Sequence, residues 1–450
     1  MRSLSNRRHA ARAAVALLLP LISFLFSPTP AFGACVLLEV RQYFDGIQVK
    51  NEGKRFIRVE EGRITRVAAS RSASDKSCKT FDLSGRFVAP GLMDLHTHVL
   101  LEDRSFGARL GSELVRVARM NEPQRLSSAR GNLRSYLYSG FTSLRDLGNS
   151  GEGLDRKISN APLRAARMSP RLFFSGPGIA VAPGQFNPEA SPEVMSREYL
   201  IVSEATSAED TVTAEGAVQR AASYGAEWIK LYADNDPSPG RLSPDLMRRL
   251  VRAAHLRHLP VAIHASSDAS VRASLDAGAT SIEHGDTVST ETLNRMATQK
   301  VFFVPTDFSA RQCLKISNSN PDPLYRNCGE YRRLRGDRLL RAHQAGVPLA
   351  FGSDYYFPSS ARGGRGAEAL DSLVAWVESG LPPLAVLVAA TSGAARVLGR
   401  DDLGLIRVGA VADIIALRAS PVADFSNLKG LRFLMKDGAV LCGGKSRCVH

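Results

Sequence analysis

The feature that most constrains the fold is an alternation of short apolar runs with longer amphipathic stretches through the middle of the chain. A glycine often marks the return to the next apolar run, as in "LRSYLYSGFTSLRD", "QRAASYGAEWIKLY", "ASLDAGATSIEH" and "LLRAHQAGVPLAFGSD". Because glycine commonly follows the last turn of a helix, each segment predicts a helix and then a strand. The predicted strands lie at residues 91–97, 140–146, 171–176, 226–232, 260–265, 279–284, 300–305 and 347–354.

Repeated βα units favour parallel strands, and eight of them favour a closed (β/α)8 TIM barrel of the α/β class. A doubly wound open sheet is the alternative, but no GxGxxG motif opens a helix after a strand. The length of 450 residues would suggest about three domains, although one α/β barrel can use roughly 300 residues or more. We expect a single barrel over residues 90–399.

The two ends of the chain read as β-structure. Short apolar alternations separated by turn residues fill residues 34–89, and "LGLIRVGAVADIIALRAS" and "LRFLMKDGAVLCGG" continue this pattern in residues 400–450. We expect the two ends to pair into one small composite β-sandwich.

Residues 1–33 have the layout of a secretory signal peptide, with an arginine-rich start, an apolar run, and Ala31 and Gly33 before the expected cleavage point. An uncleaved anchor is the alternative, but Pro20 interrupts the run, which is short for a span of about 20 residues. We expect export to the periplasm, by the general or the twin-arginine route. No stable membrane span is expected after cleavage.

The six cysteines support export, because an even number in an exported chain favours disulfides. Proximity in the sequence suggests the pairs Cys35–Cys78, Cys313–Cys328 and Cys442–Cys448, with free thiols as the alternative. There is no close CxxC pair, which argues against a zinc knuckle.

The formal net charge is +14, and removal of the four arginines in residues 1–33 leaves it near +10. The densest basic run, "YRRLRGDRLLR" at residues 331–341, is interpreted as a solvated helix face. It lacks the interleaved aromatic residues of a nucleic-acid groove, so we expect no nucleic-acid partner. A basic surface could still favour anionic substrates. The sequence leaves homo-oligomer formation open.

Polar side chains end several of the predicted strands. His96 and His98 end the first strand, and because residues i and i+2 of a strand point to the same side, both can face the barrel mouth. The other strand-end residues are Lys230, His264, His284 and Asp354. One histidine on a strand is more often structural than a metal ligand. Four histidines and an aspartate at strand ends instead favour a site for zinc or a similar metal.

These motifs resemble the amidohydrolase superfamily of metal-dependent hydrolases. The resemblance runs from about Val36 to Val440 and includes "VAPGLMDLHTH", the ordered Lys, His, His and Asp, and "GLIRVGAVADIIAL". Within this superfamily, "GFTSLRDLG", "IKLYAD", "AGATSIEHGD" and "AGVPLAFGSD" resemble the imidazolonepropionase-like branch, which includes prolidase-like dipeptidases.

The resemblance implies two divalent metal ions, with zinc the expected metal. It implies that Lys230 reacts with carbon dioxide and bridges both metals as a carbamate, whereas a buried lysine paired with an acid is the alternative. One metal would be held by His96, His98 and Asp354, and the other by His264 and His284. Bound metal lowers the pKa of water towards ~7, and Asp354 would act as general base and then as general acid.

Three residues are candidates for substrate binding. Tyr232 lies two residues after Lys230, and in similar dipeptidases a tyrosine there binds the substrate carboxylate; a packed aromatic is the alternative. Arg145 could pair with an anion, although a structural role is the commoner one for a barrel-wall arginine. Tyr355, with Tyr356, could narrow the pocket. Relatives often carry a Gly- and His-rich turn after the third strand, where this chain has "VAPGQFN" without histidine.

The sequence therefore predicts a binuclear metal-dependent hydrolase of amide bonds, a prolidase-like dipeptidase acting on a dipeptide or another small molecule. The first alternative is hydrolysis of a cyclic amide or a lactone at the same site. A metal- or ligand-binding barrel without catalysis is the remote alternative, and the intact Asp354 argues against it.

Overall fold

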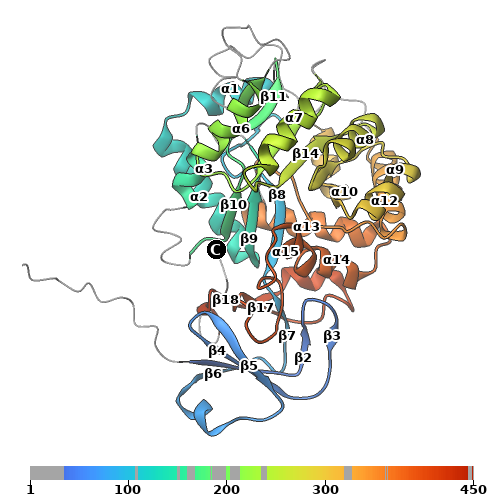
Figure 1. Cartoon of the computed structure of the whole chain (residues 1–450). Coiled ribbons are helices and arrows are strands. Elements are labelled where there is room, and N and C mark those ends of the chain that lie inside the picture. Colours follow the sequence, from blue (N-terminus) through green and yellow to red (C-terminus); the bar gives the residue numbers. More distant parts are fainter. Residues whose placement is uncertain are drawn as a thin grey trace, which may run out of the picture. The chain divides into compact units, whose positions relative to one another are not determined.

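The computed structural model describes residues 35–106, 110–148, 153–159, 168–182, 184, 199–202, 213–234, 241–318, 327–359, 361, 363–443 and 448 (Figure 1). The predicted signal peptide lies outside these residues.

All eight predicted barrel strands are present. Seven are regular: β8 (Leu92–Thr97), β9 (Phe141–Asp146), β10 (Arg171–Phe174), β13 (Ile229–Tyr232), β14 (Val261–Ala265), β15 (Ser281–His284) and β16 (Phe302–Val304). The eighth is an extended segment at residues 349–354. It is irregular around Gly352, where a Cβ atom would come within 2.6 Å of the His96 Cβ. Only glycine lets the backbone approach β8 so closely.

The strands form a closed ring of parallel neighbours. β8, β9 and β10 pair side by side, and β13 to β16 pair in sequence order. The Trp228 N–H donates to Phe174 O at 3.2 Å, which joins β10 to the start of β13. Leu349 pairs with Phe303, and the Leu95 N–H donates to Phe351 O at 2.8 Å, so the eighth segment closes the ring. The predicted (β/α)8 barrel is confirmed.

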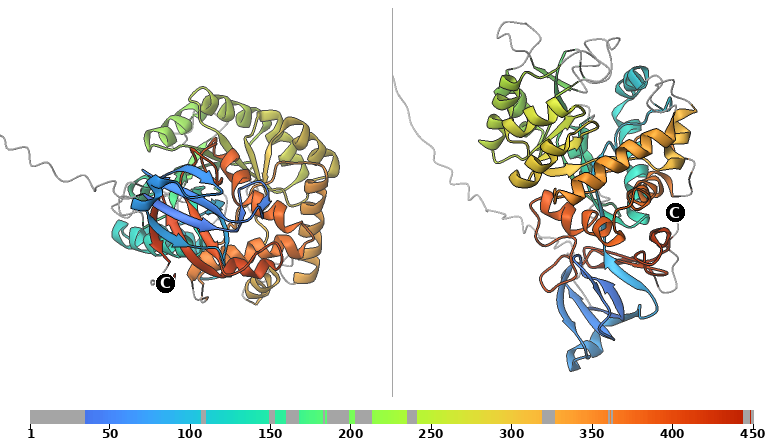
Figure 2. Two further views of the ribbon diagram at one scale, coloured as in Figure 1. Left: turned by 90° about the horizontal axis from the view of Figure 1, so that it is seen from below. Right: turned by 90° about the vertical axis from the view of Figure 1, so that its right-hand side faces the viewer.

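Two further strands follow β10 in the sequence, β11 (Gly178–Val181) and β12 (Tyr199–Val202). β11 pairs with β13 and with β12. The helices curve around the outside of the strands (Figure 2). They are α1 (Leu110–Arg119), α2 (Glu122–Tyr138), α3 (Leu154–Ser159), α6 (Ala214–Ser223), α7 (Pro244–His255), α8 (Asp268–Ala277), α9 (Thr290–Gln299), α10 (Ala310–Ser317), α12 (Cys328–Gln344), α13 (Gly364–Glu378), α14 (Pro383–Ala389) and α15 (Ser392–Val397).

The helices begin and end where local chemistry predicts. The Ser243 and Ser267 side chains accept hydrogen bonds from the first turns of α7 and α8, which satisfies backbone N–H groups that have no partner inside the helix. Gly278 ends α8 with a left-handed φ of 91°. The apolar faces of these helices then pack on the outer sides of the strands, where Leu250, Ile263 and other residues are fully buried.

The two ends of the described chain form a pair of packed sheets. One has the order β5-β4-β1-β6 and the other β19-β18-β17-β7-β2-β3. β17 pairs antiparallel with β7, which confirms that both chain ends build the small β-sandwich. The boundaries at residues 34–89 and 400–450 stay a prediction. The elements are β1 (Val36–Val40), β2 (Gln42–Phe44), β3 (Val49–Lys50), β4 (Arg55–Glu60), β5 (Arg63–Ala68), η1 (Ala73–Ser77), β6 (Lys79–Asp82), β7 (Phe87–Pro90), β17 (Ile414–Leu417), η2 (Phe425–Lys429), β18 (Leu431–Lys436) and β19 (Ala439–Cys442).

The disulfides Cys35–Cys78, Cys313–Cys328 and Cys442–Cys448 are all formed, as their proximity in the sequence predicts. The basic run at residues 331–341 differs from its interpretation as a solvated face. Arg335 and Arg338 are 9% and 1% exposed, because this side of α12 packs against the barrel. Among the described helices, none has the length and apolar character needed to cross a membrane.

Candidate metal centre

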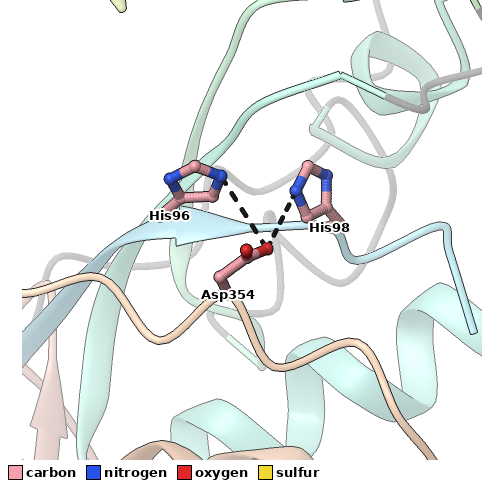
Figure 3. A group of neighbouring side chains, drawn as sticks. All are labelled: His96, His98 and Asp354. Carbon is pink, nitrogen blue, oxygen red and sulfur yellow. Dashed lines mark ion pairs between the residues drawn. The ribbon is translucent and has the colours of Figure 1, made fainter. Parts of the chain in front are cut away.

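Three of the predicted ligands lie together at the end of β8. His96 and His98 point to the same side, and Asp354 faces both from the eighth segment (Figure 3). The His98 Nε2 atom is 3.1 Å from Asp354 Oδ1, and His96 Nε2 is 3.8 Å from the same oxygen. One ligand atom from each of the three residues lies within 4.8 Å of the other two, which is a spacing that a single metal ion can bridge.

The other three predicted ligands adjoin this group. Lys230 Nζ is 3.4 Å from His96 Nε2, and the His284 ring lies 4.9 Å from the His96 ring between centroids. The rings of His264 and His284 are 4.4 Å apart. Five strand ends thus bring all six predicted residues to one mouth of the barrel, as the parallel arrangement of the strands requires.

Two of these residues have backbone conformations that L-residues rarely adopt. His284 has a φ of 71° and Asp354 a φ of 48°. Strict alternation along β15 would put His284 on the face opposite Glu283, and the left-handed turn brings its ring back towards His96 and His264. Such strain costs free energy and is concentrated at functional sites in proteins.

Glu283 orients His96, and sequence reasoning did not find it. Its Oε2 is 2.8 Å from His96 Nδ1, so His96 uses Nδ1 for this contact and turns Nε2 to the site. A carboxylate behind a histidine is the usual companion of a metal-bound imidazole. The only sequence signal was an acid beside His284 on a buried strand.

The protonation states of the candidate ligands are suited to binding a cation. Burial, with Lys230 nearby, lowers the pKa of His96, and burial, with His264 nearby, lowers the pKa of His284, so both imidazoles are neutral and have a lone pair to donate. Burial alone would raise the pKa of Asp354, but His96 and His98 hold it below its usual value. Neutral imidazoles beside an ionised carboxylate are suitable zinc ligands.

Asp234, which lies beside His264, is a second residue that sequence reasoning missed. Its Oδ1 is 3.4 Å from His264 Nε2, and its carboxylate accepts hydrogen bonds from the backbone N–H of Ser266. Burial opposes ionisation, but the contact with His264 and these hydrogen bonds hold the pKa of Asp234 far below its usual value. Asp234 is therefore a fixed negative charge beside His264.

The three predicted substrate residues differ in position. The Tyr232 ring lies 5.1 Å from Lys230 Nζ and beside His264, within the site. Arg145 is fully buried and donates to Leu95 O, Ser281 Oγ and Glu283 Oε1, an arrangement that favours the structural alternative. Tyr355 is 1% exposed and packs into a separate aromatic cluster with Phe308 and Phe357.

The next residue, Tyr356, is the one that faces the site. Its ring contacts His98 edge-on, with 5.7 Å between centroids. The sequence indicated this pair of tyrosines. Side chains do not alternate regularly after an irregular strand, so the sequence did not show which of the two faces inward.

A closed barrel with imidazoles, a lysine and an aspartate at one mouth defines a class of hydrolase that uses metal at the carboxyl ends of its strands. Residues 87–442 match the Amidohydrolase family, and the chain belongs to this family. The family generally binds divalent metals, and the chain is a hydrolase acting on carbon–nitrogen bonds.

Known proteins with similar sequences place the chain in the predicted branch. It is 27% identical over 381 residues to ochratoxinase from Aspergillus niger, covering 79% of this chain and 75% of that protein. It is 27% identical over 396 residues to imidazolonepropionase from Anaeromyxobacter dehalogenans, covering 82% and 83%. It also resembles the crystal structure of a Xaa-Pro dipeptidase with bound methionine, at 25% identity and a TM-score of 0.75, covering 91% and 100%.

Proposed function

We propose that this protein is a binuclear metal-dependent amidohydrolase that cleaves dipeptides. The observation that carries the proposal is the convergence of His96, His98 and Asp354 on one point, with Lys230 Nζ 3.4 Å from His96 Nε2. The similarity to the Xaa-Pro dipeptidase with bound methionine supports a dipeptide substrate.

The six strand-end residues would hold two divalent ions, with zinc the proposed metal. His96, His98 and Asp354 would hold one ion, and His264 and His284 the other. When bound, such ions supply a hydroxide at neutral pH and polarise the scissile carbonyl group.

Lys230 would bridge the two ions after carboxylation by carbon dioxide. Only a neutral amine can react with carbon dioxide, and burial lowers the pKa of Lys230 to about 8. A neutral fraction is therefore available near neutral pH, whereas an ordinary exposed lysine would be almost fully protonated. The amine nitrogen would form a bond to the carbon of carbon dioxide and release one proton to solvent. The resulting carbamate is an anion in a site whose other members are imidazoles and a carboxylate.

Asp354 would move the proton. Its carboxylate is ionised in the site, so an oxygen can accept a proton from the attacking water and later donate it to the leaving amine. Tyr232 would bind the substrate carboxylate through its phenol group. Gly178 lets the Tyr232 ring pack against the backbone of β11, because a Cβ atom on residue 178 would lie 2.4 Å from the ring.

A cyclic amide or a lactone is the second candidate substrate class. The similarity to imidazolonepropionase over 82% of the chain favours it. We also propose export to the periplasm, which the three disulfides and the signal-like start support.

The test is amine release by the zinc-loaded mature protein across a library of dipeptides, N-acyl amino acids and lactones. Turnover of a clustered set of dipeptides that disappears in Asp354→Asn supports the proposal. If no dipeptide is hydrolysed but a cyclic amide or lactone is, that compound class replaces dipeptides as the proposed substrate. Undiminished hydrolysis by a metal-loaded Asp354→Asn variant would overturn the proton-transfer role.

A further inference from the structure

Two buried arginines bind the backbone of the segments that carry the candidate ligands. Arg365 lies in α13 and is 3% exposed, and Arg338 lies in α12 and is 1% exposed. Both reach inward from the helix layer to carbonyl groups at the barrel mouth. An arginine is suited to this task because its guanidinium group is rigid, stays charged and offers five N–H donors.

Arg365 joins the end of the first barrel strand to the segment after the eighth. Its Nη1 donates to His98 O at 3.0 Å, and its Nη2 donates to Leu101 O and, at 3.2 Å, to Tyr356 O. One guanidinium thus holds the backbone of His98 together with the segment that begins at Asp354. These are the two ligands whose side chains approach to 3.1 Å.

Arg338 makes the matching connection on the other side of the mouth. Its Nη1 donates to His284 O, and its Nη2 donates to Pro305 O at 3.3 Å and binds Asp307. The residue after Pro305 is Thr306, whose Oγ1 lies 2.7 Å from His284 Nδ1. Arg338 therefore fixes both the strained backbone of His284 and the hydroxyl group that orients its ring.

We propose that Arg365 and Arg338 are positioning residues for the two halves of the metal centre. Arg365 positions His98 with Asp354, and Arg338 positions His284. The inference rests on the proposed two-metal function. Metal–ligand distances tolerate shifts of only about 0.2 Å. The site therefore loses metal affinity when its two segments are no longer held together, even if every ligand side chain remains.

The experiment is a titration of metal-free protein with Zn²⁺ in competition with a chromophoric chelator. Arg365→Met and Arg338→Met are each expected to weaken one Zn²⁺ binding step by about 10- to 100-fold, as loss of an outer-shell partner does. The Arg365→Met effect is expected to persist in a His264→Ala background and to vanish in a His98→Ala background. The Arg338→Met effect is expected to persist in the His98→Ala background and to vanish in the His264→Ala background.

Arg171→Met is the matched control. Arg171 is a partly buried arginine that pairs with Asp413 and Asp437, and its described contacts include no ligand-bearing segment. It is expected to lower stability and to leave Zn²⁺ affinity unchanged. If a methionine variant is unfolded by circular dichroism, the lysine variant replaces it. A single ammonium cannot bridge two carbonyl groups as a guanidinium does, so a partial loss of affinity is expected.

Wild-type affinity in folded Arg365 and Arg338 variants would overturn the inference, as would an equal loss in both backgrounds. A wild-type protein that binds no Zn²⁺ or other divalent ion would instead overturn the proposed function.

Discussion

At the scale of single residues, the centre depends on side chains that touch ligands without reaching the substrate. Glu283 is fully buried, and its two oxygens divide between His96 Nδ1 and Arg145 Nη2, each at 2.8 Å. The arginine neutralises a carboxylate that would otherwise be costly to bury. The carboxylate in turn fixes the tautomer of His96 that leaves Nε2 able to bind a metal.

We expect Glu283→Gln to weaken Zn²⁺ binding by about 10- to 100-fold, because the amide orients His96 less firmly. We also expect metal-free protein to lose ~3–5 kcal/mol in its free energy of unfolding, since Arg145 keeps a buried charge without its partner. Zinc competition and denaturant unfolding measure the two effects. Glu122→Gln, which alters an exposed pair with Lys157, is the control. Unchanged zinc affinity in the Glu283 variant would contradict the orienting role.

The carbamate on Lys230 gives a second expectation at this scale. Metal-free protein reconstituted with Zn²⁺ in buffer free of carbon dioxide is expected to bind two ions poorly, and added bicarbonate is expected to restore the second ion. Lys230→Ala is expected to hold at most one ion with or without bicarbonate. Elemental analysis of the desalted protein gives the stoichiometry. Two tightly bound ions in Lys230→Ala would rule out the bridge.

At the scale of elements, the sequence predicted the barrel because each strand and helix carries its own periodic pattern. His96, His98 and Asp354 could be placed at one mouth because parallel strands all end there. The roles of Glu283, Asp234 and the two positioning arginines could not be predicted, since each depends on a contact between strands or helices distant in sequence. The run around Arg338 was misread because its charges resemble those of an exposed helix. Arg335 and Arg338 instead turn inward, where Arg335 pairs with Asp286 and Arg338 binds Asp307 and backbone carbonyls.

The disulfide between α10 and α12 is expected to stabilise the aromatic cluster beside the site. Cys313 and Cys328 are 15 residues apart, and both adjoin the cluster of Phe308, Tyr355 and Phe357. Replacing both cysteines by serine is expected to cost about 3 kcal/mol from the entropy of a loop of that length. The matched control is Cys442→Ser with Cys448→Ser, which opens a span of 6 residues and is expected to cost about 2 kcal/mol. Denaturant midpoints measure both, and a larger loss in the control pair would contradict the loop-length argument.

At the scale of the whole molecule, buried carboxyl groups make stability depend on pH in two opposite ways. Asp234 has a lowered pKa, so its contribution is present above its unfolded pKa and is lost as pH falls through the folded value. Asp94 behaves in the opposite sense. It is fully buried, Oδ2 accepts no hydrogen bond from the described residues, and burial raises its pKa to about 7.

The folded protein therefore holds a proton on Asp94 between about pH 4 and 7, where the unfolded chain has released it. Stability from this group falls as pH rises through that window, by on the order of 4 kcal/mol in total. Asp94→Asn removes the titration while the amide oxygen can still accept from the Ser353 N–H. The unfolding free energy of metal-free wild type minus that of the variant is thus expected to decrease steadily from pH 4 to 7. This difference cancels the acids that titrate in both proteins, so a flat or rising curve would mean that Asp94 is ionised in the folded state.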